Sequence, residues 1–184
     1  MKRKVLGFSL AIAALALPAA APADLPQGAR APQFVTQGAL AGKVFNFTLS
    51  AALRKGPVVL YFYPKSFTQG CSIEARAFAA ASADFKAAGA TLIGLSADTI
   101  QTQQLFSSKD CGNRFPVGVA TPAIIDAYDV TLKKADGTQT GLSSRTSYVI
   151  GRDGRVVLAY TDMNPNQHVT KTLATVRALR QRRR

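Results

Sequence analysis

The sequence predicts an α/β fold in which helices flank a central mixed β-sheet, and three observations lead to this prediction. The chain of 184 residues is long enough for one ordinary domain, and 47% hydrophobic with 18% charged residues is a globular composition. The continuous apolar run 58–63 is typical of a central strand that is buried on both faces. After Pro64 the apolar residues recur every three or four positions, which is the period of a helix.

The N-terminal segment has the three parts of a secretory signal peptide. Positions 2–4 are all positively charged, an apolar run covers 5–17, and positions 21–23 have the small-x-small form of a cleavage site. The run is shorter than the roughly 20 apolar residues that a membrane-spanning helix needs, although an uncleaved anchor is the alternative. We therefore expect residues 1–23 to be removed, and residues 24–184 to form a single exported domain in a bacterial periplasm.

The predicted elements begin with the strand 43–48, a short helical turn over 50–55 and the strand 58–63. A helix follows and ends near Gly89, and its apolar stripe is expected to comprise Ile73, Ala77, Phe78, Ala81 and Phe85. We then expect a strand at 91–95, a helix at 99–108 and short pieces at 115–117 and 122–128.

The helix 99–108 is expected to be capped by Asp98, with Leu105 and Phe106 facing inward. Strands at 147–150 and 156–160 form a hairpin around an Asp-Gly turn, and a helix from residue 165 closes the chain. A β-α-β unit followed by an antiparallel hairpin and a closing helix is a thioredoxin-like layout.

The composition limits the chemistry. The formal net charge is +13, but no aromatic residues interleave with the arginines at the C-terminus, so we interpret them as a solvated last helical turn and expect no nucleic-acid partner. Two cysteines and one histidine are too few for a structural zinc site, and no flavin or nucleotide motif is present, so we expect no metal or cofactor. We interpret the one histidine, His168, as an ordinary surface residue, and Tyr61 and Tyr63 as core residues.

Cys71 is the candidate reactive residue because it opens the helix that follows the central strand. Unpaired backbone N–H groups and the positive end of the helix favour the thiolate over the thiol, and the thiolate is the nucleophile. Thr68 lies three residues earlier, where its hydroxyl could stand beside the sulfur. In an exported protein, the alternative is that the two cysteines form a structural disulfide.

The segment from Pro64 to Cys71 resembles the active-site pattern Pro-x-x-x-Thr/Ser-x-x-Cys of the peroxiredoxins, and most closely that of their bacterioferritin comigratory protein or peroxiredoxin Q branch in the AhpC/TSA family. The resemblance extends over roughly residues 31–160 of the chain. It is carried further by Ala31-Pro32-x-Phe34, Ser96-x-Asp98, Phe115-Pro116-Val117 and the segment from Arg145 to Gly154.

The resemblance implies a thiol-dependent peroxidase that reduces hydrogen peroxide and organic hydroperoxides without a cofactor. Cys71 would be the peroxidatic cysteine and would become a sulfenic acid. Thr68 and Arg145 would bind the peroxide oxygens, and Arg145 would also favour the thiolate. Pro64 would shield the sulfur from water. Two supporting residues are Gly70, which would fix the loop, and Glu74, which would orient an arginine.

The position five residues after Cys71, where many members of this branch have a second cysteine, is Arg76 here. The resemblance to another subgroup therefore makes Cys111 the resolving cysteine, in an intramolecular disulfide that requires both helix ends to unwind. A thioredoxin-like or other exported thiol reductant would then restore the thiols, and a monomer is expected by analogy.

Two other functions remain open at this point. The first is an exported thiol–disulfide oxidoreductase of the thioredoxin type, although Glu74 stands where its Cys-x-x-Cys motif would need a cysteine. The second is a binding module whose two cysteines form a fixed bridge.

Overall fold

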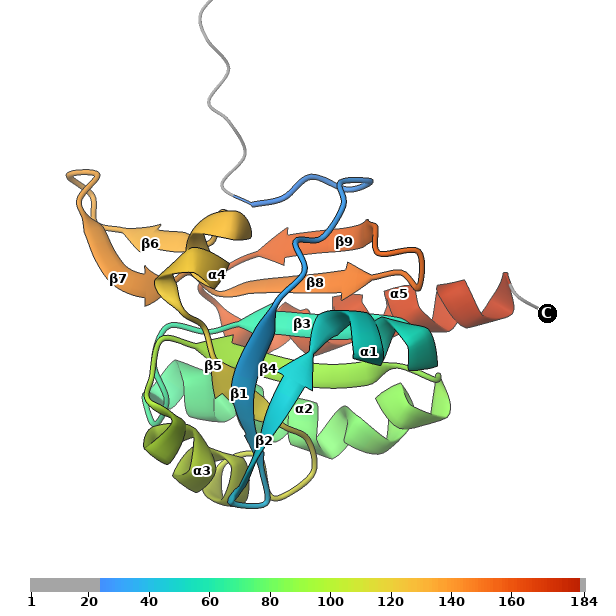
Figure 1. The fold of residues 1–184 in the computed structure, drawn as a ribbon, viewed down its shortest axis with the longest axis horizontal. Coiled ribbons are helices and arrows are strands. Elements are labelled where there is room, and N and C mark those ends of the chain that lie inside the picture. Colours follow the sequence, from blue (N-terminus) through green and yellow to red (C-terminus); the bar gives the residue numbers. More distant parts are fainter. Residues whose placement is uncertain (1–23, 183–184) are drawn as a thin grey trace, which may run out of the picture.

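The computed structural model describes residues 24–182, so the predicted signal peptide and the last two arginines lie outside the described residues. Seven strands form one mixed sheet in the order β2-β1-β5-β4-β3-β8-β9, with helices on both faces (Figure 1). This confirms the predicted α/β fold class and its thioredoxin-like layout.

The elements of the large sheet and of a small second sheet have the following bounds. The large sheet contains β1 (Val35–Leu40), β2 (Lys43–Thr48), β3 (Val58–Phe62), β4 (Thr91–Ser96), β5 (Val117–Val119), β8 (Thr146–Ile150) and β9 (Val156–Thr161). The small sheet pairs β6 (Thr131–Lys133) with β7 (Gln139–Ser143). The helices are α1 (Leu49–Lys55), α2 (Gln69–Ala87), α3 (Ile100–Lys109), α4 (Pro122–Ala127), the 3-10 turn η1 (Pro165–Gln167) and α5 (His168–Gln181).

Strand β3 lies at the centre of the sheet and carries the chain into the candidate site. It runs parallel to β4 and antiparallel to β8, and all five of its residues are buried. Strands β8 and β9 form the predicted hairpin, and Gly154 in its turn has a φ of 78°, which glycine adopts without steric cost. The central apolar run is therefore the inner strand that the sequence predicts.

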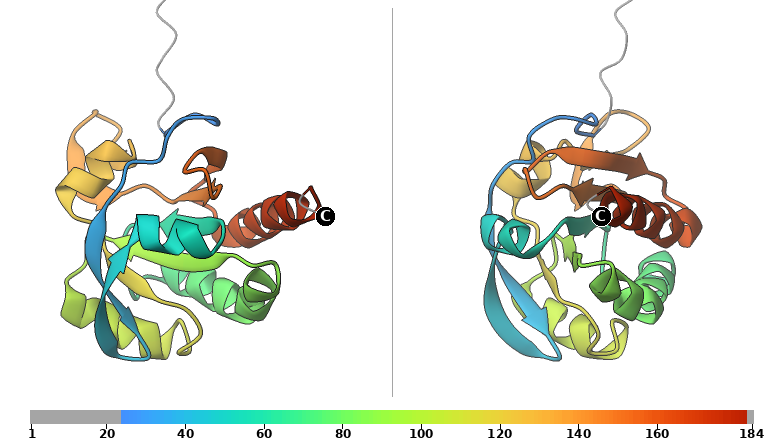
Figure 2. Two further views of the ribbon diagram at one scale, coloured as in Figure 1. Left: turned by 45° about the vertical axis from the view of Figure 1, so that its right-hand side comes forward. Right: turned by 90° about the vertical axis from the view of Figure 1, so that its right-hand side faces the viewer.

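Alternate residues of β3 divide the core into two clusters on opposite faces of the sheet. Val58, Leu60 and Phe62 pack with α1 and α4, whereas Val59 and Tyr61 pack with α2, α3 and α5. Figure 2 shows α2 and α5 side by side on one face, with α1 on the other. Both cysteines belong to the second cluster.

Several detailed expectations are wrong. Ile73 is 46% exposed, because the buried face of α2 runs through Cys71, Glu74, Ala75 and Phe78 instead. Leu105 is also exposed, whereas Phe106 is buried as predicted.

The helix α3 is capped by Thr99, one residue after the predicted cap Asp98. Thr99, not Asp98, accepts the backbone N–H of Thr102, while the Asp98 carboxylate accepts from the Ser66 N–H and the Ser96 hydroxyl. Asp98 therefore fastens the loop after β3 to β4.

Within residues 24–182, no helix combines the length and apolar character that crossing a bilayer would need. In the same part of the chain, no group of three His, Cys, Asp or Glu side chains is placed to hold a metal ion.

Candidate active site

Cys71 occupies the first turn of α2, directly after the loop that leaves β3. Its side chain is buried, with 2% exposure, and it is not disulfide-bonded. The first N–H groups of a helix have no intrahelical acceptors, and the N-terminal end of the helix carries partial positive charge. This location stabilises negative charge on the sulfur.

Arg145 stands just before β8 and brings a cation to the same sulfur. Its Nη2 donates to the Sγ of Cys71 at 3.4 Å, and its Nε donates to the backbone carbonyl of Met163 at 3.0 Å. Its Nη1 donates to the carboxylate of Glu74. All the contacts come from a side chain that is itself buried, so the guanidinium is fixed in one orientation.

Gly70 has no side chain, and the Arg145 guanidinium lies close to where one would be. A Cβ atom at position 70 would lie 3.1 Å from the Nη2 of Arg145, so a larger side chain would press on the group that contacts Cys71. The glycine expected to fix the loop is also the residue that lets Arg145 approach.

Glu74 lies one helical turn after Cys71 and is fully buried. Burial raises the pKa of Glu74 from an ordinary 4.5 to about 8, although the charge of Arg145 opposes this rise. Burial alone would lower the pKa of Arg145, but its negatively charged neighbours raise it overall. The arginine therefore stays charged, whereas the carboxyl group holds its proton far more firmly than usual.

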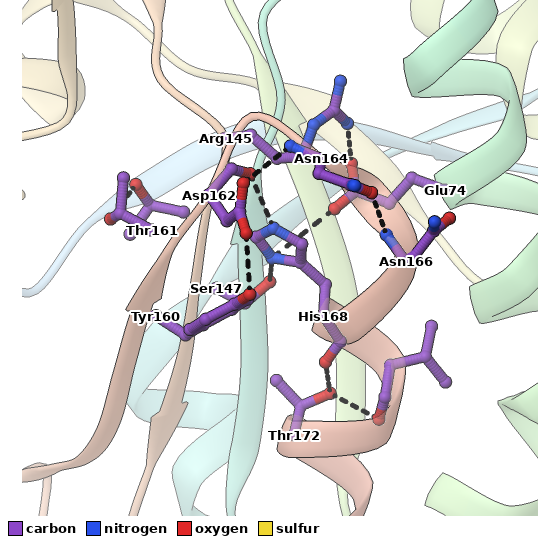
Figure 3. A network of polar contacts seen from close by, with 12 residues as sticks. Glu74, Arg145, Ser147, Tyr160, Thr161, Asp162, Asn164, Asn166, His168 and Thr172 are labelled. Carbon is purple, nitrogen blue, oxygen red and sulfur yellow. Dashed lines mark hydrogen bonds and ion pairs between the residues drawn. The ribbon is translucent and has the colours of Figure 1, made fainter.

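His168 corrects the sequence interpretation, because it is fully buried at the start of α5 and is not a surface residue. Its Nδ1 lies 2.8 Å from the hydroxyl of Ser147 and its Nε2 lies 2.9 Å from the carbonyl oxygen of Asp162. Figure 3 shows the ring beside the carboxyl group of Glu74, and Nδ1 is 3.7 Å from Oε1. The histidine thus lies next to the Arg145–Glu74 contact behind Cys71.

The spacing of residues along the last helix could have predicted that His168 is buried. Positions 168, 172 and 176 lie four residues apart, and Thr172 and Val176 are buried on the same face of α5 as His168. Ser147 and Asp162 were not predicted, because the groups that they present to His168 come together only through the β8–β9 hairpin and the loop after it.

Cys111 follows α3 and is also buried and unbonded. The preceding Asp110 accepts from the Ser72 hydroxyl at 3.2 Å and from the Nε and Nη2 of Arg76 at 3.0 and 2.6 Å. Burial and then the charge of Asp110 raise the pKa of Cys111. The segment with the second thiol is therefore tied to the first turns of α2, and its thiol is kept protonated.

Thr68 and Pro64 frame the loop before Cys71. The Thr68 hydroxyl is exposed and donates to the Lys65 carbonyl at 2.9 Å, and Pro64 is half-buried after Tyr63. Phe67 has a φ of 63°, a strained value for a bulky residue, and its ring meets that of Phe106 edge-on at 5.2 Å. The loop is thus packed against α3, which precedes Cys111.

Comparisons with known proteins agree with this arrangement. The sequence profile described as the AhpC/TSA family matches residues 27–159. Peroxiredoxin Bcp of Xanthomonas campestris is 33% identical over 123 residues, which is 66% of this chain and 76% of that protein.

Two solved structures are similar as well. A Xylella fastidiosa PrxQ variant superposes with a TM-score of 0.74 at 27% identity, covering 84% of this chain and 97% of the other. The bacterioferritin comigratory protein of Xanthomonas campestris, in a study of its alkyl peroxide reduction, has a TM-score of 0.68 at 31% identity, covering 78% and 91%. The chain therefore belongs to the AhpC/TSA family and is a peroxiredoxin of the bacterioferritin comigratory protein and peroxiredoxin Q branch, a thiol-dependent peroxidase.

Proposed function

We propose that Cys71 is the peroxidatic cysteine and that it reduces hydrogen peroxide and organic hydroperoxides. The observation that carries this proposal is the contact between the Arg145 guanidinium and the sulfur of Cys71 at the start of α2. The alkyl peroxide reduction ascribed to the Xanthomonas campestris protein supports organic hydroperoxides as substrates.

In the first step, the Cys71 thiolate attacks the terminal oxygen of the hydroperoxide. The S–O bond forms as the O–O bond breaks, and the terminal oxygen keeps its hydrogen, so that the cysteine becomes a sulfenic acid. The leaving alkoxide or hydroxide takes a proton from water. Arg145 stabilises the negative charge that moves from sulfur to the leaving oxygen.

Thr68, Pro64, Gly70 and Glu74 have supporting roles in this proposal. Rotation of the Thr68 hydroxyl away from the Lys65 carbonyl would make it a second donor to the peroxide. Pro64 limits access of water to the sulfur, Gly70 leaves room for Arg145, and Glu74 holds the guanidinium in place.

In the second step, the Cys111 sulfur attacks the sulfenic sulfur of Cys71. The S–S bond forms, the S–O bond breaks, and the hydroxyl group takes up the proton that Cys111 loses and leaves as water. Burial of Cys111 opposes this step, so the segment after α3 must move first and break the contacts of Asp110 with Ser72 and Arg76. A thiol reductant then reduces the disulfide.

We also propose that the protein works outside the cytoplasm after removal of residues 1–23, and as a monomer. The reductant would then be an exported thioredoxin-like protein or another exported thiol. The N-terminal charge cluster and apolar run support this location.

The test is a stopped reaction of the reduced mature protein with one equivalent of hydrogen peroxide, followed by thiol trapping and mass spectrometry. We expect the wild type to lose both thiols into one intramolecular bond. Cys111→Ser should stop at a sulfenic acid, and Cys71→Ser should not react.

Slow oxidation that does not depend on which cysteine is removed would overturn the proposal. A parallel insulin-reduction assay separates the remaining functions, because only a thiol–disulfide oxidoreductase would accelerate it.

A further inference from the structure

The two carboxyl oxygens of Glu74 have different surroundings. Oε2 accepts from Arg145, whereas Oε1 is buried and has no hydrogen-bond partner among residues 24–182. A buried oxygen without a partner is costly and calls for an explanation. The Nδ1 of His168 faces it at 3.7 Å, less than 1 Å beyond hydrogen-bond distance.

The contacts of His168 determine which ring nitrogen carries hydrogen. The carbonyl oxygen of Asp162 only accepts hydrogen bonds, so the Nε2 atom beside it is the donor. In the neutral ring, Nδ1 is then an acceptor, and the Ser147 hydroxyl donates to it. Nδ1 is therefore the ring atom that can gain a proton, and it is also the atom that faces Glu74 (Figure 3).

Several ionisable groups surround this pair on the neighbouring elements. They are Cys71 on α2, Arg145 before β8, Tyr61 on β3, Tyr160 on β9, Asp162 after β9, and Lys171 on α5, whose ammonium lies over the Tyr160 ring. Burial raises the pKa of Glu74 to about 8. Burial lowers the pKa of His168, the charge of Arg145 lowers it further, and Asp162 opposes both.

These opposite shifts favour a proton on the Glu74 side of the pair over a proton on His168. A proton on Oε1 needs an acceptor, and the lone pair of Nδ1 can accept it when the Ser147 hydroxyl, which otherwise donates to Nδ1, turns its own hydrogen away. A small shift of either side chain would close the gap.

We propose that His168 is a positioning residue of the Cys71 site, and that its Nδ1 shares with the Oε1 of Glu74 one proton that controls how strongly Arg145 acts on the sulfur. While Glu74 is neutral, its carboxyl group does not offset the guanidinium charge beside Cys71. When the proton leaves, the carboxylate competes with the sulfur for that charge. This inference rests on the proposed role of Cys71.

The first test uses the fact that His168 is the one histidine of the chain, so its ring signals in an NMR spectrum need no assignment. In a Cys71→Ser background, where the cysteine cannot ionise, we expect the ring shifts to show a transition centred near pH 8. Glu74→Gln should abolish that transition.

Thr172→Val is the matched control, because among residues 24–182 the Thr172 hydroxyl hydrogen-bonds only to the backbone carbonyls of His168 and Val169. It should keep the transition. Flat shifts between about pH 6.5 and 9.5, or the same transition in Glu74→Gln, would overturn the proposal.

The second test measures the pH profile of Cys71 alkylation by iodoacetamide in a Cys111→Ser background. On the rising part of the profile, His168→Leu should react about tenfold more slowly than the wild type at the same pH, which corresponds to a displacement of about one pH unit. His168→Gln, whose carboxamide both donates and accepts, should recover much of the rate.

Equal losses in both His168 variants, or a wild-type profile in His168→Leu, would contradict the shared proton. Because neither alkylation nor the NMR titration needs peroxide, failure of the peroxidase assay alone would overturn the proposed function, whereas failure of these two tests alone would overturn the shared proton.

Discussion

At the scale of single residues, Tyr61 and Tyr63 present two buried hydroxyl groups with opposite surroundings. The Tyr61 hydroxyl has no hydrogen-bond partner among residues 24–182, whereas that of Tyr63 donates to Gln103 at 2.7 Å and lies 3.3 Å from Ser66. A buried polar group without a partner loses its contacts with water and gains nothing in return.

We therefore predict that Tyr61→Phe stabilises the protein by about 1 kcal/mol and that Tyr63→Phe destabilises it by about the same amount. Urea denaturation of the two variants measures both effects. A loss of stability in Tyr61→Phe would show that its hydroxyl has a partner, such as an ordered water molecule.

Glu74 makes the fold less stable as the pH rises, which is opposite to the usual effect of a carboxyl group. Because its pKa rises from 4.5 to about 8 on folding, the folded protein binds more protons than the unfolded chain between these two values. This contribution is fully present below about pH 4.5 and is lost as the pH rises through about 8.

The free energy of unfolding of the wild type, relative to that of Glu74→Gln, should therefore fall as the pH rises from 5 to 9. Urea titrations of both proteins at several pH values measure this difference. A constant difference would mean that the carboxyl group ionises alike in the folded and unfolded states.

His168 illustrates what the sequence does and does not predict about single residues. The order of motifs led to Cys71, Arg145 and Glu74, and the structure brings these three together. The sequence interpretation placed His168 on the surface because a polar residue near a helix start is usually exposed. Its acceptors and donors come from β8 and the loop after β9, and that spatial meeting has no signature in the local sequence.

At the scale of elements, Asp110 connects the end of α3 to the beginning of α2. Its carboxylate is buried, whereas 70% of the Arg76 side chain that binds it is exposed, so the solvent weakens this ion pair. The contact still has to break before Cys111 can reach Cys71 in the proposed mechanism.

Arg76→Ala should therefore speed disulfide formation about fivefold, which corresponds to a loss of about 1 kcal/mol in the contact. Quenched reactions with thiol trapping measure the rate from sulfenic acid to disulfide. Arg177→Ala is the matched control, because it removes an exposed ion pair with Asp84 farther along α2 and should leave the rate unchanged. A slower rate in Arg76→Ala would mean that the contact guides resolution instead of restraining it.

The elements that the sequence analysis missed are those with the weakest patterns. Strand β1 contains a glutamine and a glycine, and its identity as a strand depends on pairing with β2 and β5. Strands β6 and β7 form a small separate sheet, and β6 has three residues. By contrast, β3 and the β8–β9 hairpin have strong apolar and turn signals, and both were predicted.

At the scale of the whole molecule, the sheet separates the two cysteines from half of the core. Cys71 and Cys111 share one cluster with α2 and α5, while α1, α4 and the other side of β3 form the second cluster. A rearrangement around the cysteines can therefore leave the opposite face intact.

We predict that oxidation to the disulfide increases hydrogen exchange in the first turns of α2 and in residues 107–114, with no change in β3, β8 or α1. Mass spectrometry of exchange in the reduced and oxidised proteins measures this pattern. Cys111→Ser treated with peroxide is the control and should remain protected. Increased exchange on both faces would indicate a global change.

The edge-on contact of Phe67 with Phe106 offers a way to follow that rearrangement by fluorescence. The chain contains no tryptophan, so an indole introduced by Phe67→Trp would be its sole tryptophan fluorophore. It would sit on the loop before Cys71 and rest on the helix before Cys111. Its emission would change when the two segments part, and each catalytic turnover could be followed in real time without any added dye.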